Sequence, residues 1–162
     1  MIGKEQITTH DRLREPGLGS HWLGRERYAV HGNAVVAFPL LEGDRVELVD
    51  PEGLQCAHVL AVNANSEFCT AHLGLAPNIA AARISELLSR DTSGAAKFRV
   101  KLKSIGVDLA GARAAEVLSG LTEPGSSVEF VSETDCIVLI AAPGNDMEVD
   151  RQTPPTLSLI HI

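Results

Sequence analysis

The sequence predicts an α+β fold in which a bent antiparallel β-sheet or barrel of six or more strands carries two flanking α-helices. Three observations predict it. Polar and apolar residues alternate in Arg45–Val49, as in a strand with one exposed face. Residues are apolar on both faces of Gln55–Val62, which indicates a strand inside a sheet. Apolar residues recur at helical spacing in Asn78–Arg90, which indicates an amphipathic helix.

The first half of the chain contains the central element of this prediction. Ala34–Phe38 is expected to form the first strand and to end at Pro39. Arg45–Val49 and Gln55–Val62 are expected to pair as a hairpin at the centre of the fold. The reason is that Asp50–Gly53, with the sequence Asp-Pro-Glu-Gly, has the composition of a type I turn.

The second half is expected to contain the remaining strands and the second helix. Phe98–Leu102 alternates and is expected to form a strand. Asp108–Ser119 is expected to form a helix, with Asp108 as its N-cap and the following glycine as its stop. Val128–Val131 and Cys136–Ala141 are expected to be the last two strands.

The chain divides into four predicted segments. Residues 1–34 are expected to be an irregular N-terminal segment packed on the sheet, 35–145 the α+β domain, and 146–156 a polar, proline-bearing linker. Residues 157–162 (LSLIHI) match the translation of a widely used transposon-end sequencing adapter. We interpret them as a non-native tail, after which the natural protein would continue differently; the alternative is a genuine short terminal strand.

Composition excludes several classes of partner. The formal charge of −7 and the 4% aromatic content argue against nucleic acid. The cluster Lys97, Arg99, Lys101 and Lys103 is interpreted as a solvated strand face rather than an anion site. The longest apolar run, Cys136–Ala142, is too short to span a bilayer. Three cysteines, an odd number, fit free thiols in a reducing compartment, so a cytoplasmic protein is expected.

The candidate metal ligands are Cys56, His58, Cys69 and His72. Cys56 and His58 are two apart on a predicted strand and therefore share a face, and Cys69-x-x-His72 has chelating spacing. Sulfur and imidazole ligands suit zinc. A structural role is the alternative, and the one that we favour, because Cys in apolar surroundings acts as a small hydrophobe. Cys69 could instead be a nucleophile with His72 or His58 as its base, although nothing in the sequence marks it as activated.

One set of residues resembles the urea-carboxylase-associated family. Gly43, Val49, Asp50, Gly53 and Gln55 stand at the positions of that family's signature, and GSSVEFVSETDCIVLIAAPGNDM is similar to its final hairpin. This resemblance implies a stand-alone, metal-dependent hydrolase similar to carboxyguanidine deiminase, acting on a urea-like substrate. The chain departs from the family pattern at His58, where the family has Asp.

A second resemblance covers other segments. GLGSHWLGRERYAV, EGDRVELVDPEG and an APG…PPT linker look like the N-terminal domain of aminomethyltransferase-like proteins, relatives of the folate-dependent glycine-cleavage T protein. This resemblance implies an accessory, non-catalytic domain of a truncated enzyme, with no catalytic or cofactor-binding residues of its own. Tetrahydrofolate would belong to a downstream transferase domain, its partner in the same chain, and a small amine or urea-like ligand could bind here. A structural or oligomerisation module is a further alternative.

Overall fold

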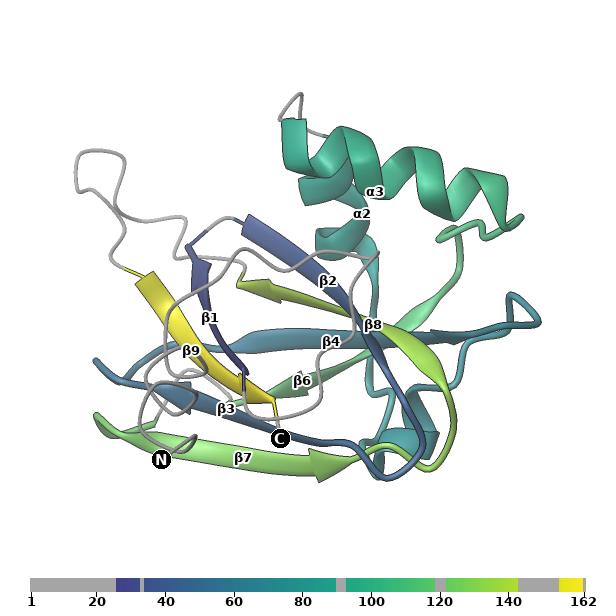
Figure 1. The fold of residues 1–162 in the computed structure, drawn as a ribbon. Coiled ribbons are helices and arrows are strands. Elements are labelled where there is room, and N and C mark those ends of the chain that lie inside the picture. Colours follow the sequence, from purple (N-terminus) through teal and green to yellow (C-terminus); the bar gives the residue numbers. More distant parts are fainter. Residues whose placement is uncertain (1–25, 33, 90–92, 119–121, 143–154, 162) are drawn as a thin grey trace, which may run out of the picture.

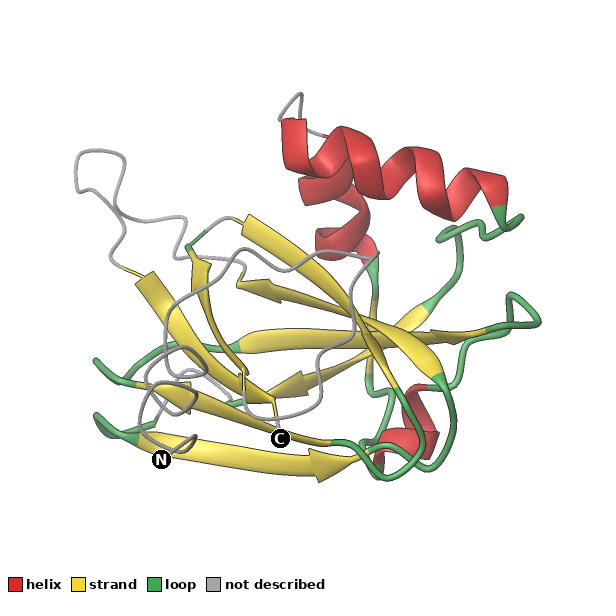
Figure 2. Cartoon of the chain, in the orientation of Figure 1, coloured by secondary structure: helices red, strands yellow, loops and turns green. Residues whose placement is uncertain are grey.

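The computed structural model describes residues 26–32, 34–89, 93–118, 122–142 and 155–161. They form three layers, two β-sheets and a pair of helices (Figures 1 and 2). The outer sheet has the order β1-β9-β3-β7, with strands Glu26–His31, Pro155–His161, Arg45–Asp50 and Ser126–Val131. The central sheet has the order β2-β8-β4-β6-β5, with strands Ala34–Leu40, Cys136–Ala142, Ala57–Asn63, Arg113–Val117 and Ile79–Ala80.

The third layer consists of helices α2 (Ala82–Ser89) and α3 (Ser93–Ser104), which cover one face of the central sheet (Figure 1). A short 3-10 helix, η1 (Thr70–Leu73), follows β4. All strand pairs are antiparallel. The predicted α+β class, with an antiparallel sheet and two flanking helices, is therefore confirmed. Within the described residues, neither helix has the length and apolar character needed to cross a bilayer.

Two apolar cores lie on opposite faces of the central sheet. The first fills the space between the sheets, and the second lies under the helices. Strand β4 contributes to both: Ala57, Val59 and Ala61 to the first, and Leu60 and Val62 to the second. This explains why its sequence is apolar on both faces, and it confirms that the strand is internal, between β8 and β6.

The predicted central hairpin is wrong, because its two strands belong to different sheets. Strand β3 pairs with β7 and β9, whereas β4 pairs with β8 and β6. The turn between them is held by the buried Asp50 carboxylate, which accepts hydrogen bonds from the Gly53 amide (2.8 Å) and the Gln55 amide (3.0 Å). It also accepts one from the Thr122 hydroxyl (2.8 Å). The turn composition was informative, but the turn carries the chain from one sheet to the other.

The predicted strand at Phe98–Leu102 and the predicted helix at Asp108–Ser119 are also wrong. The first lies inside α3 and the second contains β6. The basic residues of α3 alternate along the sequence, which is the pattern of a strand. The apolar residues Phe98, Leu102 and Ile105, however, recur at the i, i+4, i+7 spacing of a helix. Strand β6 lies between β4 and β5. The small alanine side chains of β6 fit a helix or a strand equally well, so packing against β4 and β5 determines that this segment is a strand.

The predicted terminal segments lie partly outside the described residues. Residues 1–25 and 143–154 are outside them, which includes most of the predicted linker. Within the predicted irregular segment 1–34, residues 26–31 form β1. The predicted tail 157–162 overlaps β9, which pairs with β1 and β3. This pairing does not test the origin of those codons, so the adapter interpretation remains a prediction.

Candidate metal centre

Three potential metal ligands meet where β4 begins. His58 on β4 is directly paired with Glu116 on β6, and the His58 Nε2 and Glu116 Oε2 atoms are 3.3 Å apart. Cys56 precedes His58 by two residues, which places it toward the same side of the strand. The ligand atoms of the three residues all lie within 4.8 Å of one another. The structure therefore contains a Cys-His-Glu cluster that could hold a metal ion.

The imidazole of His58 is prepared to act as a neutral ligand. Its side chain is only 12% exposed. Burial lowers the pKa of His58 below its usual value, and the Arg83 charge also lowers it, whereas the hydrogen bond and charge of Glu116 act in the opposite direction. The ring is therefore uncharged at neutral pH, and an uncharged imidazole has a lone pair for a metal.

One ring nitrogen of His58 has no partner. Nδ1 is buried and forms no hydrogen bond with any residue that the structure describes. A buried polar atom without a partner costs about 1–3 kcal/mol. A neutral imidazole binds a cation through one nitrogen only. That nitrogen can be Nε2, by exchanging its contact with Glu116, or Nδ1, which no described residue contacts.

Cys56 is a protonated thiol when no cation is near. Burial raises the pKa of Cys56, and the Glu116 charge raises it further, while a hydrogen bond from its own backbone amide acts in the opposite direction. A divalent ion would reverse this balance, because it stabilises the thiolate and neutralises the carboxylate. The thiol is thus unreactive as a free nucleophile and suited to a metal.

The loop before β5 holds the Glu116 strand in register. The backbone amide of Glu116 donates a hydrogen bond to Asn78 Oδ1 at 2.9 Å. Three residues earlier on β6, Arg113 Nε donates to the carbonyl of Pro77 at 3.2 Å. These contacts position the Glu116 carboxylate, 37% exposed, on the solvent side of the cluster.

The four ligands expected from the sequence do not meet in one place. Cys56 and His58 lie together in the cluster, whereas Cys69 is buried in the core between the two sheets and His72 is exposed on η1. The Cys69 amide donates to the carbonyl of Ala61 at 2.9 Å, and its side chain packs with Ala61 in the core on the face of β4 opposite His58. Burial raises the pKa of Cys69 to about 12, and the neighbouring Cys136 thiol adds to the shift. Its thiol is therefore protonated at neutral pH.

Sequence reasoning missed Glu116. The sequence predicts a helix over 108–119, in which Glu116 would have no relation to a strand 58 residues earlier. The alternation around Glu116 covers only five strand residues, Arg113–Val117, so the available signal was weak.

The distances in the cluster fit a tetrahedral zinc site. Zinc bonded to nitrogen and oxygen at its usual lengths in tetrahedral geometry separates the two ligand atoms by roughly 3.4 Å. The His58 and Glu116 atoms already have nearly that separation, 3.3 Å. A sulfur ligand would have to lie roughly 3.5 Å from each of the others. The Cys56 sulfur lies within 4.8 Å of both, so binding the same ion would bring it closer to them.

Comparisons with known proteins give one similar sequence and one structural neighbour to report. No family sequence profile matches the chain. Over 144 residues the chain is 29% identical to trimethylamine-oxide aldolase from Ruegeria pomeroyi, which covers 89% of this chain. The chain spans only 18% of the length of that relative. A crystal structure of a DUF1989 family protein from Silicibacter pomeroyi matches at a TM-score of 0.46 and 14% identity, covering 86% of this chain and 76% of its own.

The similarity to trimethylamine-oxide aldolase corrects the resemblances drawn from the sequence. The relative is neither an aminomethyltransferase nor a urea-carboxylase-associated protein by name. The interpretation as an accessory, non-catalytic domain of an aminomethyltransferase-like enzyme is therefore wrong, and so are its alternatives, the carboxyguanidine-type hydrolase and the purely structural module. The similarity to trimethylamine-oxide aldolase extends over most of the chain, but over only a small part of that enzyme.

Proposed function

We propose that this chain provides the zinc centre of an enzyme that cleaves a small methylated amine oxide. The observation that carries the proposal is the Cys56-His58-Glu116 cluster, with ligand atoms within 4.8 Å and one buried His58 nitrogen without a partner among the described residues. Three protein ligands are typical of catalytic zinc, because they leave the fourth position to water or substrate.

The residues of the cluster have separable roles. When bound, zinc supplies a Lewis acid that polarises an oxygen atom of the substrate. His58 and Cys56 anchor the ion from the buried side, because burial favours the neutral imidazole and disfavours an uncompensated thiolate. Glu116 is exposed, whereas Cys56 and His58 are at least partly buried, so substrate approaches from the Glu116 side of the cluster.

The substrate class follows from the relative's name together with the chemistry of the cluster. Trimethylamine oxide carries a negatively polarised oxygen of the kind that zinc binds. An aldolase releases an aldehyde, and trimethylamine oxide can release formaldehyde and dimethylamine without an external oxidant. The N–O bond and one C–N bond break, the oxygen moves to that methyl carbon, and one hydrogen of the methyl group ends on nitrogen. The carbon is oxidised by two electrons as the nitrogen is reduced by two, so the products balance.

Metal content is the first test. The purified chain is loaded with zinc, freed of excess by gel filtration, and analysed by mass spectrometry for bound metal. We expect about one zinc per chain, and loss of most of it in His58→Ala and Glu116→Gln. The matched controls are His72→Ala and Glu133→Gln, two exposed residues outside the cluster, which should retain the metal. Equal zinc content in His58→Ala and His72→Ala would refute the centre.

Activity is the second test. The zinc-loaded chain is incubated with trimethylamine oxide, and formaldehyde is trapped as a coloured adduct while dimethylamine is measured by chromatography. Equimolar release of both, lost in His58→Ala and retained in His72→Ala, supports the proposal. Stoichiometric zinc without either product would retain the metal centre and reject the lyase reaction for this chain.

A further inference from the structure

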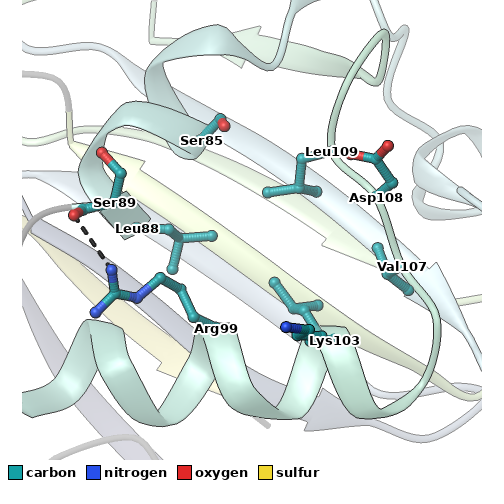
Figure 3. A pocket seen from close by; sticks show the side chains of 9 residues that line it. Ser85, Leu88, Ser89, Arg99, Lys103, Val107, Asp108 and Leu109 are labelled. Carbon is teal, nitrogen blue, oxygen red and sulfur yellow. Dashed lines mark hydrogen bonds between the residues drawn. The ribbon is translucent and has the colours of Figure 1, made fainter.

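A second site lies in the helical layer, away from the metal cluster. A cavity of about 250 Å³ opens between α2, α3 and the segment that follows α3 (Figure 3). None of its lining residues belongs to the Cys-His-Glu cluster. Its walls combine two cations, two serines, one carboxylate and an apolar floor. The lining residues are Ser85, Leu88, Ser89, Arg99, Leu102, Lys103, Val107, Asp108 and Leu109.

Arg99 is held in place within this cavity. It reaches from α3 toward α2, where its Nη1 donates a hydrogen bond to the carbonyl of Ser89 at 3.2 Å (Figure 3). A guanidinium has five N–H donors in a rigid fork, so four remain for another acceptor. The hydrogen bond to Ser89 orients the guanidinium and leaves its other N–H groups able to donate to a ligand. A donor that is already oriented loses less conformational entropy when it binds a ligand.

Lys103 lies one helical turn further along α3 on the same face. Among the residues that the structure describes, no carboxylate forms an ion pair with it. Arg99 can be understood as a cap for the C-terminal carbonyls of α2. That role explains neither Lys103 nor the cavity beside it. Two cations on one helix face beside an open cavity can both donate charge-assisted hydrogen bonds to a bound anion.

The rest of the cavity limits the kind of anion. Leu88 and Leu102 are buried, and Val107 and Leu109 are half-buried, so the floor is apolar. Asp108 adds one negative charge, and its Oδ1 accepts the Ala110 amide at 2.9 Å. Two cations and one carboxylate leave a net charge of +1, which matches a monoanion better than a phosphate dianion.

We propose that this cavity binds a small aliphatic monocarboxylate. Arg99 and Lys103 hold the carboxylate, and the aliphatic body lies on the leucines of the floor. The volume is below that of pockets for drug-sized ligands, so a ligand of a few carbons is the right size. This assignment also reinterprets the basic cluster, whose alternate members face different cavities: Lys101 lines another one, beside Pro39 and Ile137.

Three probes of graded chemistry test the site. The ¹⁵N-labelled chain is titrated with butyrate, with n-butanol and with inorganic phosphate, and backbone amide shifts are followed by NMR. We expect saturable shifts at Ser85, Ser89 and residues 99–109 with butyrate, and at least tenfold weaker binding of butanol and phosphate. Equal binding of butanol would overturn recognition of the charge, and equal binding of phosphate would overturn recognition of an aliphatic body.

Variants connect the binding to named residues. Lys103→Gln should weaken butyrate binding about tenfold, because a charge-assisted hydrogen bond is lost. Lys101→Gln is the matched control, since it removes the same charge from the same helix but lies at the other cavity. Arg99→Lys, which keeps the charge and removes the fork, should weaken binding by a smaller factor. A dissociation constant that rises equally in Lys103→Gln and Lys101→Gln, or rises in neither, would overturn the proposal. The titration needs no metal, so its result is independent of the zinc centre.

Discussion

His58 and Glu116 face each other across paired positions of β4 and β6, with 3.3 Å between the imidazole Nε2 and the carboxylate Oε2. They are 58 residues apart in the sequence. Directly opposed residues of an antiparallel pair have neighbouring side chains, so the register of two strands creates the contact. Cys56, on the same strand segment as His58, completes the cluster. The chemistry of the site therefore depends on the β4–β6 register.

Zinc binding should release protons. The pKa of Cys56 is raised by burial and by Glu116, so the apo protein carries the thiol, which a metal converts to thiolate. The pKa of His58 is lowered, so the imidazole has no proton to release at neutral pH. We expect about one proton per zinc at pH 7.5. Calorimetric titration in buffers of different ionisation enthalpy measures it. Cys56→Ser should release close to none, and unchanged release in that variant would exclude Cys56 as a ligand.

Stability should fall at alkaline pH because of the buried thiols. The pKa of Cys69 is about 12 in the folded chain, against 9.0 as its ordinary value. Between these values the unfolded chain loses a proton that the folded chain keeps, so the free energy of unfolding decreases as pH rises. The raised pKa values of Cys56 and Cys136 act in the same direction. Urea unfolding at pH 8 and pH 10 measures the slope. Cys69→Ala should reduce it; a slope identical to that of the wild type would contradict the assignment.

Gly53 should tolerate no side chain. Its φ is +81°, and a Cβ there would lie 2.9 Å from both the Pro124 nitrogen and the Thr122 carbonyl oxygen. The matched control is Gly43, with φ +90° and no atom within 4 Å of the added Cβ. Gly43→Ala should cost about 1–2 kcal/mol for the left-handed backbone alone. Gly53→Ala should cost at least about 2 kcal/mol more, because backbone atoms must move. Chemical unfolding measures the loss of unfolding free energy in each variant. Equal losses would mean that the Thr122–Pro124 segment moves away from the added Cβ without an energetic cost.

Asp50 should be the residue whose loss most destabilises the crossing between the sheets. It is fully buried, and its carboxylate accepts hydrogen bonds from Gly53, Gln55 and Thr122. Asp50→Ala leaves three donors without this acceptor and should cost about 3–5 kcal/mol. Thr122→Val removes one of the bonds and should cost about 1–2 kcal/mol. Equilibrium unfolding measures both, and similar values for the two variants would show that the Asp50 bonds to the turn amides contribute little.

Sequence reasoning succeeded where one segment contains the whole signal. The alternation in β3, the doubly apolar β4 and the apolar stripe of α2 each reflect the burial of their own residues. It failed at α3 and β6, where alternating lysines and small alanines fit either structure. It also failed at the turn after Asp50, because turn composition does not specify whether the next strand pairs with the previous one or joins another sheet.

The sequence by itself determined the fold class, the internal position of β4, and the placement of Cys56 and His58 on one side of that strand. These features follow from side-chain patterns that repeat every two residues in a strand and every 3.6 residues in a helix, within one local segment. Only the tertiary structure decided that Glu116 joins them, that Cys69 and His72 lie elsewhere, and that Arg99 and Lys103 share a cavity with α2. The physical reason is that these relations arise from strand register and layer packing between distant segments, whose stability depends on burial that no single segment encodes.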